Sequence, residues 1–204
     1  STGRHHRHGC DTSDRQKGDW KAVAHIIGER VILREYRESD KERIREWVND
    51  PEVTRNLSNI FIRGHTEPMS SGFVDRILRN EDRNGFYYII ARREDGEYLG
   101  QIDLAGIDWY NRRGTLAIVI PDRENRGKGI GSEAIRLLLD YAFNRINLHK
   151  VELEVYEYNK GAYELYLRLG FVEEGRRRAR VYRDGRYYDS IDMGILREEF
   201  LAQS

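Results

Sequence analysis

The segment from Thr115 to Ile120 restricts the fold more than any other part of the chain. Its residues are apolar almost throughout, which is typical of a strand at the centre of a sheet. A glycine-rich stretch follows, and from Ser132 apolar residues recur at helical spacing. The pattern then repeats: Lys150 to Tyr156 alternates like a strand, and Asn159 to Leu169 has one apolar stripe that ends at Gly170. Two successive strand–helix units predict an α/β fold.

The remaining segments agree with this fold class. Ser39 and Glu42 have the spacing of a capping box, in which Ser39 is the N-cap of a helix that ends before Pro51. Asp184-Gly185 suits the type I′ turn of a hairpin. A second short helix is predicted over Ser71 to Arg79, with Phe73, Val74, Ile77 and Leu78 buried. The other predicted strands are Val31–Arg34, Phe86–Ala91, Tyr98–Leu104, Arg176–Tyr182 and Arg186–Leu196.

Composition limits the class of protein further. At 204 residues the chain can bury a substantial core, and we predict one domain over 28–204. Its 35 basic and 35 acidic residues balance, which gives no reason to expect nucleic-acid binding, and no apolar run approaches the roughly 20 residues of a membrane span. Cys10 is the single cysteine, so the sequence favours a reducing cytoplasm. Residues 1–20, rich in His and Arg, are predicted to be a disordered tail or an expression remnant.

The glycine-rich stretch carries the clearest chemical signal. Gly127, Gly129 and Gly131 allow a tight turn that brings backbone N–H groups close to a ligand. Those groups lie at a helix N-terminus, and Arg126 and Lys128 add positive charge, so the stretch suits a diphosphate. The glycine spacing fits neither a P-loop nor a dinucleotide fingerprint. Taken alone, three glycines are equally compatible with a plain strand–helix turn.

This stretch resembles the acetyl-CoA loop of the GNAT superfamily of N-acetyltransferases, Arg/Gln-x-x-Gly-x-Gly/Ala, with Arg126, Gly129 and Gly131 at the three defined positions. The resemblance implies that the loop amides bind the CoA diphosphate and that the preceding strand binds the pantetheine arm through its backbone. It implies no metal. The implied cofactor-binding residues are Ile118, Val119, Ile120, Arg126, Gly127, Lys128, Gly129, Ile130, Gly131, Ser132 and Asn159.

A second motif strengthens the resemblance. It reads Asn159-x-x-Ala162-x-x-Leu165-Tyr166-x-x-x-Gly170-Phe171 and directly follows a strand, as in the family. There the Asn contacts pantetheine, and the Tyr is the general acid for the departing thiolate. Each residue also has a structural alternative, since Asn159 is a good N-cap and Tyr166 belongs to the apolar stripe.

The resemblance covers about 30–198 and implies a GNAT-like domain, a mixed sheet of about seven strands flanked by about four helices. Segments 148–155 and 184–189 are similar to the branch with ribosomal-protein N-terminal and spermidine acetyltransferases. The implied reaction transfers acetyl directly from acetyl-CoA to a primary amine, either a protein N-terminal α-amine or a small-molecule amine. Alternatives are a polyamine or aminoglycoside acetyltransferase and a non-catalytic acyl-CoA sensor.

The general base and the acceptor are less well defined by the sequence. The central strand contains no acid, so we rank Glu154 first as the base because it follows a buried pattern, then Asp103 and His65, with a water relay as a further option. The irregular segment Val53 to Met69 is expected to shape the amine pocket, and its lack of an acidic cluster favours a peptide α-amine or a monoamine. The tyrosine-rich C-terminal hairpin suggests a homodimer.

Overall fold

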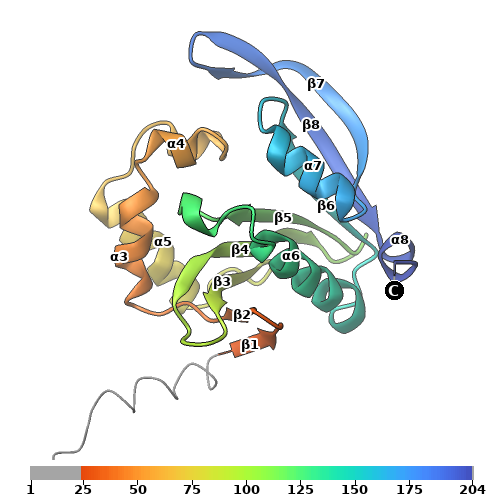
Figure 1. The fold of residues 1–204 in the computed structure, drawn as a ribbon, viewed down its shortest axis with the longest axis horizontal. Helices are drawn as coiled ribbons and strands as arrows, with labels where there is room; N and C mark the ends of the chain where they lie inside the picture. The colour runs from red at the N-terminus through yellow and green to blue at the C-terminus, as the bar shows by residue number, and fades with distance from the viewer. Residues whose placement is uncertain (1–23, 204) are drawn as a thin grey trace, which may run out of the picture.

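A computed structural model describes residues 24–203, which form a mixed sheet of eight strands in the order β1-β2-β3-β4-β5-β6-β8-β7 (Figure 1). Neighbouring strands are antiparallel except β5 and β6, which are parallel. The strands are β1 (Ala24–Ile27), β2 (Val31–Arg34), β3 (Phe86–Arg92), β4 (Tyr98–Asp108), β5 (Arg113–Val119), β6 (Lys150–Tyr156), β7 (Val172–Arg183) and β8 (Arg186–Leu196).

Six α-helices and three helical turns of the 3₁₀ or π type complete the described part of the chain. The helices are α3 (Asp40–Trp47), α4 (Pro51–Thr54), α5 (Glu67–Leu78), α6 (Ile130–Asp140), α7 (Lys160–Arg168) and α8 (Arg197–Leu201), and the turns are η1 (Asn59–Phe61), η2 (Arg123–Asn125) and the π-helical η3 (Tyr141–Arg145). The predicted α/β class and mixed sheet are confirmed. The predicted tail at 1–20, with Cys10, lies outside the described residues.

The sheet separates two apolar cores. Val31 and Leu33 of β2 point into the larger core, together with residues of α6 and α7, while Ile32 points into a smaller core with α3 and α5. This alternation follows from the two-residue period of a strand. Strand β1, which the sequence pattern did not predict, extends the sheet by pairing Ile27 with Ile32.

The predicted capping box at Ser39 is wrong. Ser39 has helical dihedral angles, φ −64° and ψ −19°, and its side chain makes no capping hydrogen bond. The polar signal of this segment comes instead from Asp40, which is buried and accepts hydrogen bonds from Arg34 at 2.8 and 2.9 Å and from the Arg37 amide at 2.8 Å. A buried ion pair, rather than a cap, fixes the start of α3.

The second predicted helix begins earlier than its apolar pattern indicates. Helix α5 starts at Glu67, where Pro68 suits the first turn because it needs no intrahelical hydrogen-bond donor. Val74 is fully buried, but Leu78, predicted to be buried, is 43% exposed at the last residue of the helix. The predicted type I′ turn is consistent with the dihedral angles, since Asp184 and Gly185 both have positive φ, 51° and 86°.

No helix among residues 24–203 has the length and apolar character needed to cross a bilayer.

Candidate active site

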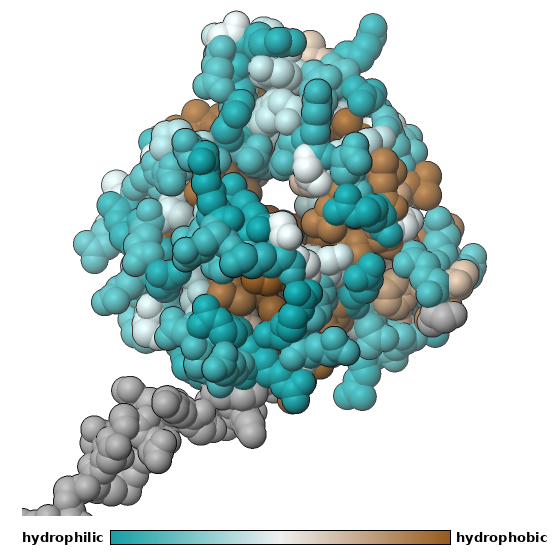
Figure 2. All heavy atoms as spheres, in the orientation of Figure 1, coloured by the Kyte–Doolittle hydropathy of each residue, from teal (hydrophilic) through white to brown (hydrophobic). Residues whose placement is uncertain are grey.

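The two parallel strands at the centre of the sheet separate toward their carboxyl ends. β5 pairs with β6 only through Arg113, Gly114 and Thr115, whose partners are Lys150, Val151 and Glu152. Beyond this point β5 continues to residue 119 and β6 to residue 156, and the two strands no longer pair with each other. Figure 2 shows the molecule hollowed near the centre of this view. The backbone edges that face the gap are therefore open to hydrogen bonds from a ligand.

The glycine loop lies between the end of β5 and the start of α6. Gly127 and Gly129 have φ of +70° and +78°, a region that favours glycine, and Gly129 is the N-cap of α6. No described side chain caps this helix, so its first amides remain available to an anion. At Gly131 an added Cβ would lie 3.4 Å from Ile120 Cδ1 and 3.7 Å from Leu165 Cδ2, which shows how closely β5, α6 and α7 converge. This cradle fits the diphosphate and pantetheine of CoA.

Two arginines hold the loop in place. Arg126, predicted from sequence, folds back so that Nε and Nη2 donate to the carbonyls of Ile120 and Pro121 at 3.0 and 3.1 Å. Arg30 was not predicted; its Nη1 donates to the Lys128 carbonyl at 2.6 Å. Local patterns could not reveal Arg30, because almost 100 residues separate it from the loop.

Glu133, in the first turn of α6, ties the same loop to the sheet. Its carboxylate accepts hydrogen bonds from the backbone amides of Arg30 and Val31, at 3.0 and 2.7 Å. The turn between β1 and β2 is therefore part of the support for the loop.

Asn159 and Tyr166 lie on α7, directly after β6. Asn159 occupies the N-cap position but makes no side-chain capping hydrogen bond, so the side-chain amide is free of the structural role that was its alternative. Tyr166 is 8% exposed, packs edge-on against Phe171 at 5.8 Å, and has no hydrogen-bond partner for its hydroxyl among residues 24–203. Burial raises the pKa of Tyr166 to about 12, so the phenol stays protonated at neutral pH.

The candidate bases differ sharply in their surroundings. Glu154 is exposed, so the expected buried pattern at this position is wrong. Asp103 lies on β4 and pairs with Ala117 of the neighbouring strand β5, in the stretch of β5 that does not pair with β6. Burial, and then the nearby charge of Asp82, raises the pKa of Asp103 to about 7. Nε2 of the third candidate, His65, lies 3.1 Å from the Ile60 carbonyl oxygen.

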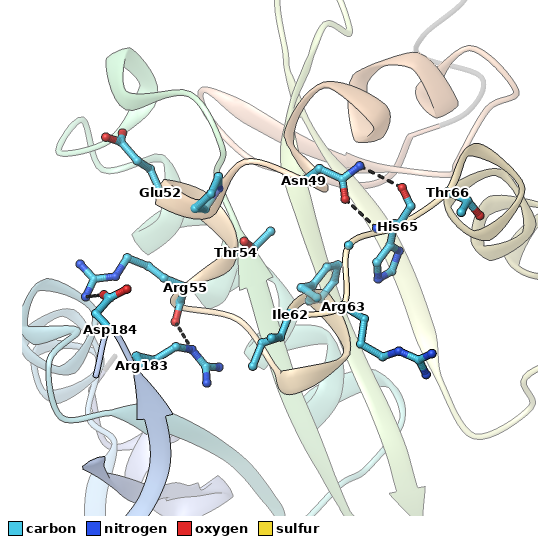
Figure 3. A pocket seen from close by; sticks show the side chains of 13 residues that line it. Asn49, Glu52, Thr54, Arg55, Ile62, Arg63, His65, Thr66, Arg183 and Asp184 are labelled. Atoms are coloured by element: carbon cyan, nitrogen blue, oxygen red, sulfur yellow. Dashed lines mark hydrogen bonds and ion pairs between the residues drawn. The ribbon is translucent and has the colours of Figure 1, made fainter. Parts of the chain in front are cut away.

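A groove of about 690 Å³ opens where α4 and η1 face the tip of the β7–β8 hairpin (Figure 3). Many of its lining residues come from the predicted segment 53–69. The hairpin contacts this segment through an ion pair between Arg55 and Asp184 at 3.2 Å. The hydroxyl of Tyr158 also donates a hydrogen bond to the Arg55 carbonyl. Because Tyr158 lies two residues after the end of β6, the groove adjoins the carboxyl end of that strand.

Among the described residues no group of three or more His, Cys, Asp or Glu side chains comes together as a metal site would require.

The divided sheet and the glycine loop define the class of an acetyl-CoA-dependent N-acetyltransferase. The chain belongs to the acetyltransferase (GNAT) domain family, whose model matches residues 30–172. Among curated proteins it is 30% identical over 180 residues to the SPbeta prophage-derived uncharacterized N-acetyltransferase YokL of Bacillus subtilis, covering 88% of this chain and 97% of that protein.

Two further comparisons connect the chain with spermidine acetyltransferases. It is 36% identical over 109 residues to the spermidine N(1)-acetyltransferase of Escherichia coli, covering 53% of this chain and 58% of the relative. A crystal structure of spermidine N-acetyltransferase from Vibrio cholerae, in complex with CoA and spermine, superimposes with a TM-score of 0.75 at 25% identity, covering 85% of this chain and 99% of that one. The expected fold, cofactor and enzyme class are confirmed by these relationships.

Proposed function

We propose that this protein transfers the acetyl group of acetyl-CoA to a primary amine by direct attack within a ternary complex. The observation that carries the proposal is the gap between β5 and β6, with the CoA loop after β5, Asp103 on the neighbouring strand β4, and Tyr166 on α7, the helix after β6. Holding both reactants in one gap orients the amine toward the thioester and so lowers the barrier to transfer. The backbone edge of residues 118–120, the amides of 127–132 and the Asn159 side chain bind CoA.

Asp103 and Tyr166 divide the proton transfers. Asp103, with a pKa of about 7, accepts the proton that the amine loses as its nitrogen attacks the thioester carbon. An amide of β5 near Val119 stabilises the tetrahedral oxyanion. When the C–S bond breaks, Tyr166 donates its hydroxyl proton to the sulfur. Asp103 replaces Glu154 as the preferred base because its pKa of about 7 suits proton transfer at neutral pH.

Replacing Tyr166 with Phe tests this assignment. The variant should bind CoA as the wild type does, because the buried ring is retained, while the rate of transfer falls about 10²- to 10⁴-fold. Thiol release measures the rate, and calorimetry with CoA measures binding. An unchanged rate would remove Tyr166 from the mechanism. Failure of CoA to bind the wild-type protein would contradict the whole proposal.

The leading acceptor is a peptide α-amine or a monoamine, and a polyamine is the second candidate. The polyamine is supported by the names of the relatives and by a smaller cleft of about 460 Å³, between α4 and η2, lined by Asp50, Glu52, Asp122 and Glu124 together with two arginines. An amine panel of N-terminal peptides, spermidine and an aminoglycoside, assayed for acetyl-CoA-dependent thiol release, separates these acceptors.

A homodimer formed through the C-terminal hairpin is part of the proposal, as is a cytoplasmic location. β7 is an edge strand of the sheet, and Tyr182 and Tyr187, near the hairpin tip, are 56% and 62% exposed. Such an edge is open to pairing with a second copy. Light scattering that gives the mass of a monomer at tens of micromolar would contradict the dimer.

A further inference from the structure

Among residues 24–203, Arg183 is a buried cation that forms no ion pair with a carboxylate. Its side chain lines the groove, yet the residue is only 8% exposed. Its guanidinium donates to the carbonyls of Tyr182, Arg55 and Leu57 at 2.8, 3.4 and 3.3 Å and to Asn59 Oδ1 at 3.2 Å. All four acceptors are neutral. Buried charges in proteins are normally paired, so the missing partner points to a ligand.

The carboxylates that line the groove do not fill this role. Asp184 faces Arg55 at 3.2 Å, and Glu52 faces Arg123 at 2.7 Å. Arg63, on the loop after η1, also lines the groove and has no ion-pair partner within the described chain. As far as the described residues show, the groove therefore has two cations without carboxylate partners and no unpaired carboxylate, which is the opposite of what a polyamine requires.

The position of Arg183 connects the groove with the reaction centre. Its guanidinium lies over the Tyr156 ring, 5.4 Å from the centroid, and Tyr156 is the last residue of β6 at the open end of the gap. A molecule whose amine reaches into the gap would extend past Tyr156 into the groove.

We propose that the acceptor is a primary amine that also carries a carboxylate, and that Arg183 binds this carboxylate while Arg63, at the far rim of the groove, attracts it. This inference rests on the proposed acetyltransferase function. A peptide with a free α-amine and an acidic side chain close to its N-terminus has the required chemistry. Here Arg183 is a specificity residue and takes no proton.

Matched peptides test the proposal, since the Glu and Gln members of each pair share one size and one N-terminal residue. The probes are Ala-Glu-Ala-Ala-amide and Ala-Ala-Glu-Ala-amide, their Gln counterparts, and spermidine. We expect the wild type to acetylate at least one Glu peptide about 10- to 100-fold more efficiently, in kcat/KM, than its Gln counterpart, as a charge-assisted hydrogen bond predicts.

Three variants assign the preference to the groove. Arg183→Gln should remove the preference for Glu by raising KM for the Glu peptide, while the Gln peptide and acetyl-CoA keep their KM. Arg63→Gln should reduce it a few-fold. Arg83→Gln, an exposed arginine after α5, is the matched control and should leave it unchanged. If Arg183→Gln lowers activity on both peptides equally, Arg183 serves only to hold the hairpin and the proposal is wrong.

The wild-type results also separate the two levels of inference. Equal rates on Glu and Gln peptides, or a preference for spermidine over both, overturn the carboxylate-bearing acceptor but leave the acetyltransferase intact. If CoA fails to bind and no amine is acetylated, the proposed function itself fails.

Discussion

At the scale of single residues, Asp103 connects the chemistry of the site with the stability of the fold. Its folded-state pKa of about 7 lies above the usual aspartate pKa of 3.8, so the folded protein holds this proton more tightly than the unfolded chain does. Stability therefore falls as the pH rises from about 4 to about 7, because an ionised Asp103 is poorly solvated where it lies.

Replacing Asp103 with Asn should have opposite effects on activity and stability. The rate of acetyl transfer should fall by about 10²- to 10⁴-fold. In the wild type this rate declines below pH 7 because the base becomes protonated, and the variant should not show that decline. Above pH 7 the variant should be about 1–3 kcal/mol more stable to unfolding than the wild type, with no gain near pH 4. Rate–pH profiles and urea denaturation at both pH values measure these effects. A normal rate for the variant would return the role of base to Glu154 or water.

Some site residues can be predicted from sequence and others cannot. Asn159 and Tyr166 belong to a local motif in which helical spacing fixes their relative positions. The pKa of Asp103 depends on burial beneath distant elements, and Arg183 meets Leu57 across 126 positions of sequence. Such contacts exist only after the fold has formed. Sequence reasoning therefore ranked Asp103 only second as the general base and did not identify Arg183.

At the scale of elements, Gly100 in β4 fixes the end of β5. A side chain at Gly100 would overlap the Val119 carbonyl oxygen and lie 3.2 Å from the Ile120 Cα. These are main-chain atoms of the segment proposed to bind pantetheine, and they cannot rotate away as a side chain can.

Replacing Gly100 with Ala should therefore shift that segment. We expect weaker CoA binding, about 10-fold or more in Kd, and a loss of about 1–3 kcal/mol in the free energy of unfolding, as overpacking predicts. Calorimetry and thermal unfolding measure both. Gly175→Ala in β7 is the control, because beyond its chain neighbours no atom of the described residues lies within 4 Å of its Cβ position, and its φ is not positive. If Gly100→Ala binds CoA normally, this end of β5 does not contact it.

Element boundaries were predictable where apolar periodicity is strong. β6 begins and ends at the predicted residues, Lys150 and Tyr156. β1 was missed because its residues, Ala24–Ile27, show no regular alternation of apolar and polar side chains. The start of α5 was misplaced because Pro68, rather than an apolar stripe, sets it.

At the scale of the whole molecule, the sheet consists of two parts with a narrow connection. Three register pairs join β5 to β6, while β3 and β4 alone share six. On the groove side, Arg183 and the Arg55–Asp184 pair provide a second link between the parts. A ligand in the gap would touch both parts at once and should stabilise the protein as a unit.

CoA at a hundred times its Kd should stabilise the folded state by about 2.7 kcal/mol, which for a chain of this size corresponds to about 5–10 °C in Tm. Hydrogen exchange should slow in two places: at 130–132, where the first amides of α6 meet the diphosphate, and at 116–119, where the strand meets pantetheine. 3′-Phosphoadenosine 5′-diphosphate is the matched probe, because it retains the nucleotide and the diphosphate of CoA and lacks the pantetheine arm. It should leave exchange at 116–119 unchanged. Pantetheine does not lie in the gap between β5 and β6 if CoA and the probe protect both segments equally. The same conclusion follows if CoA gives no protection from hydrogen exchange at 116–119.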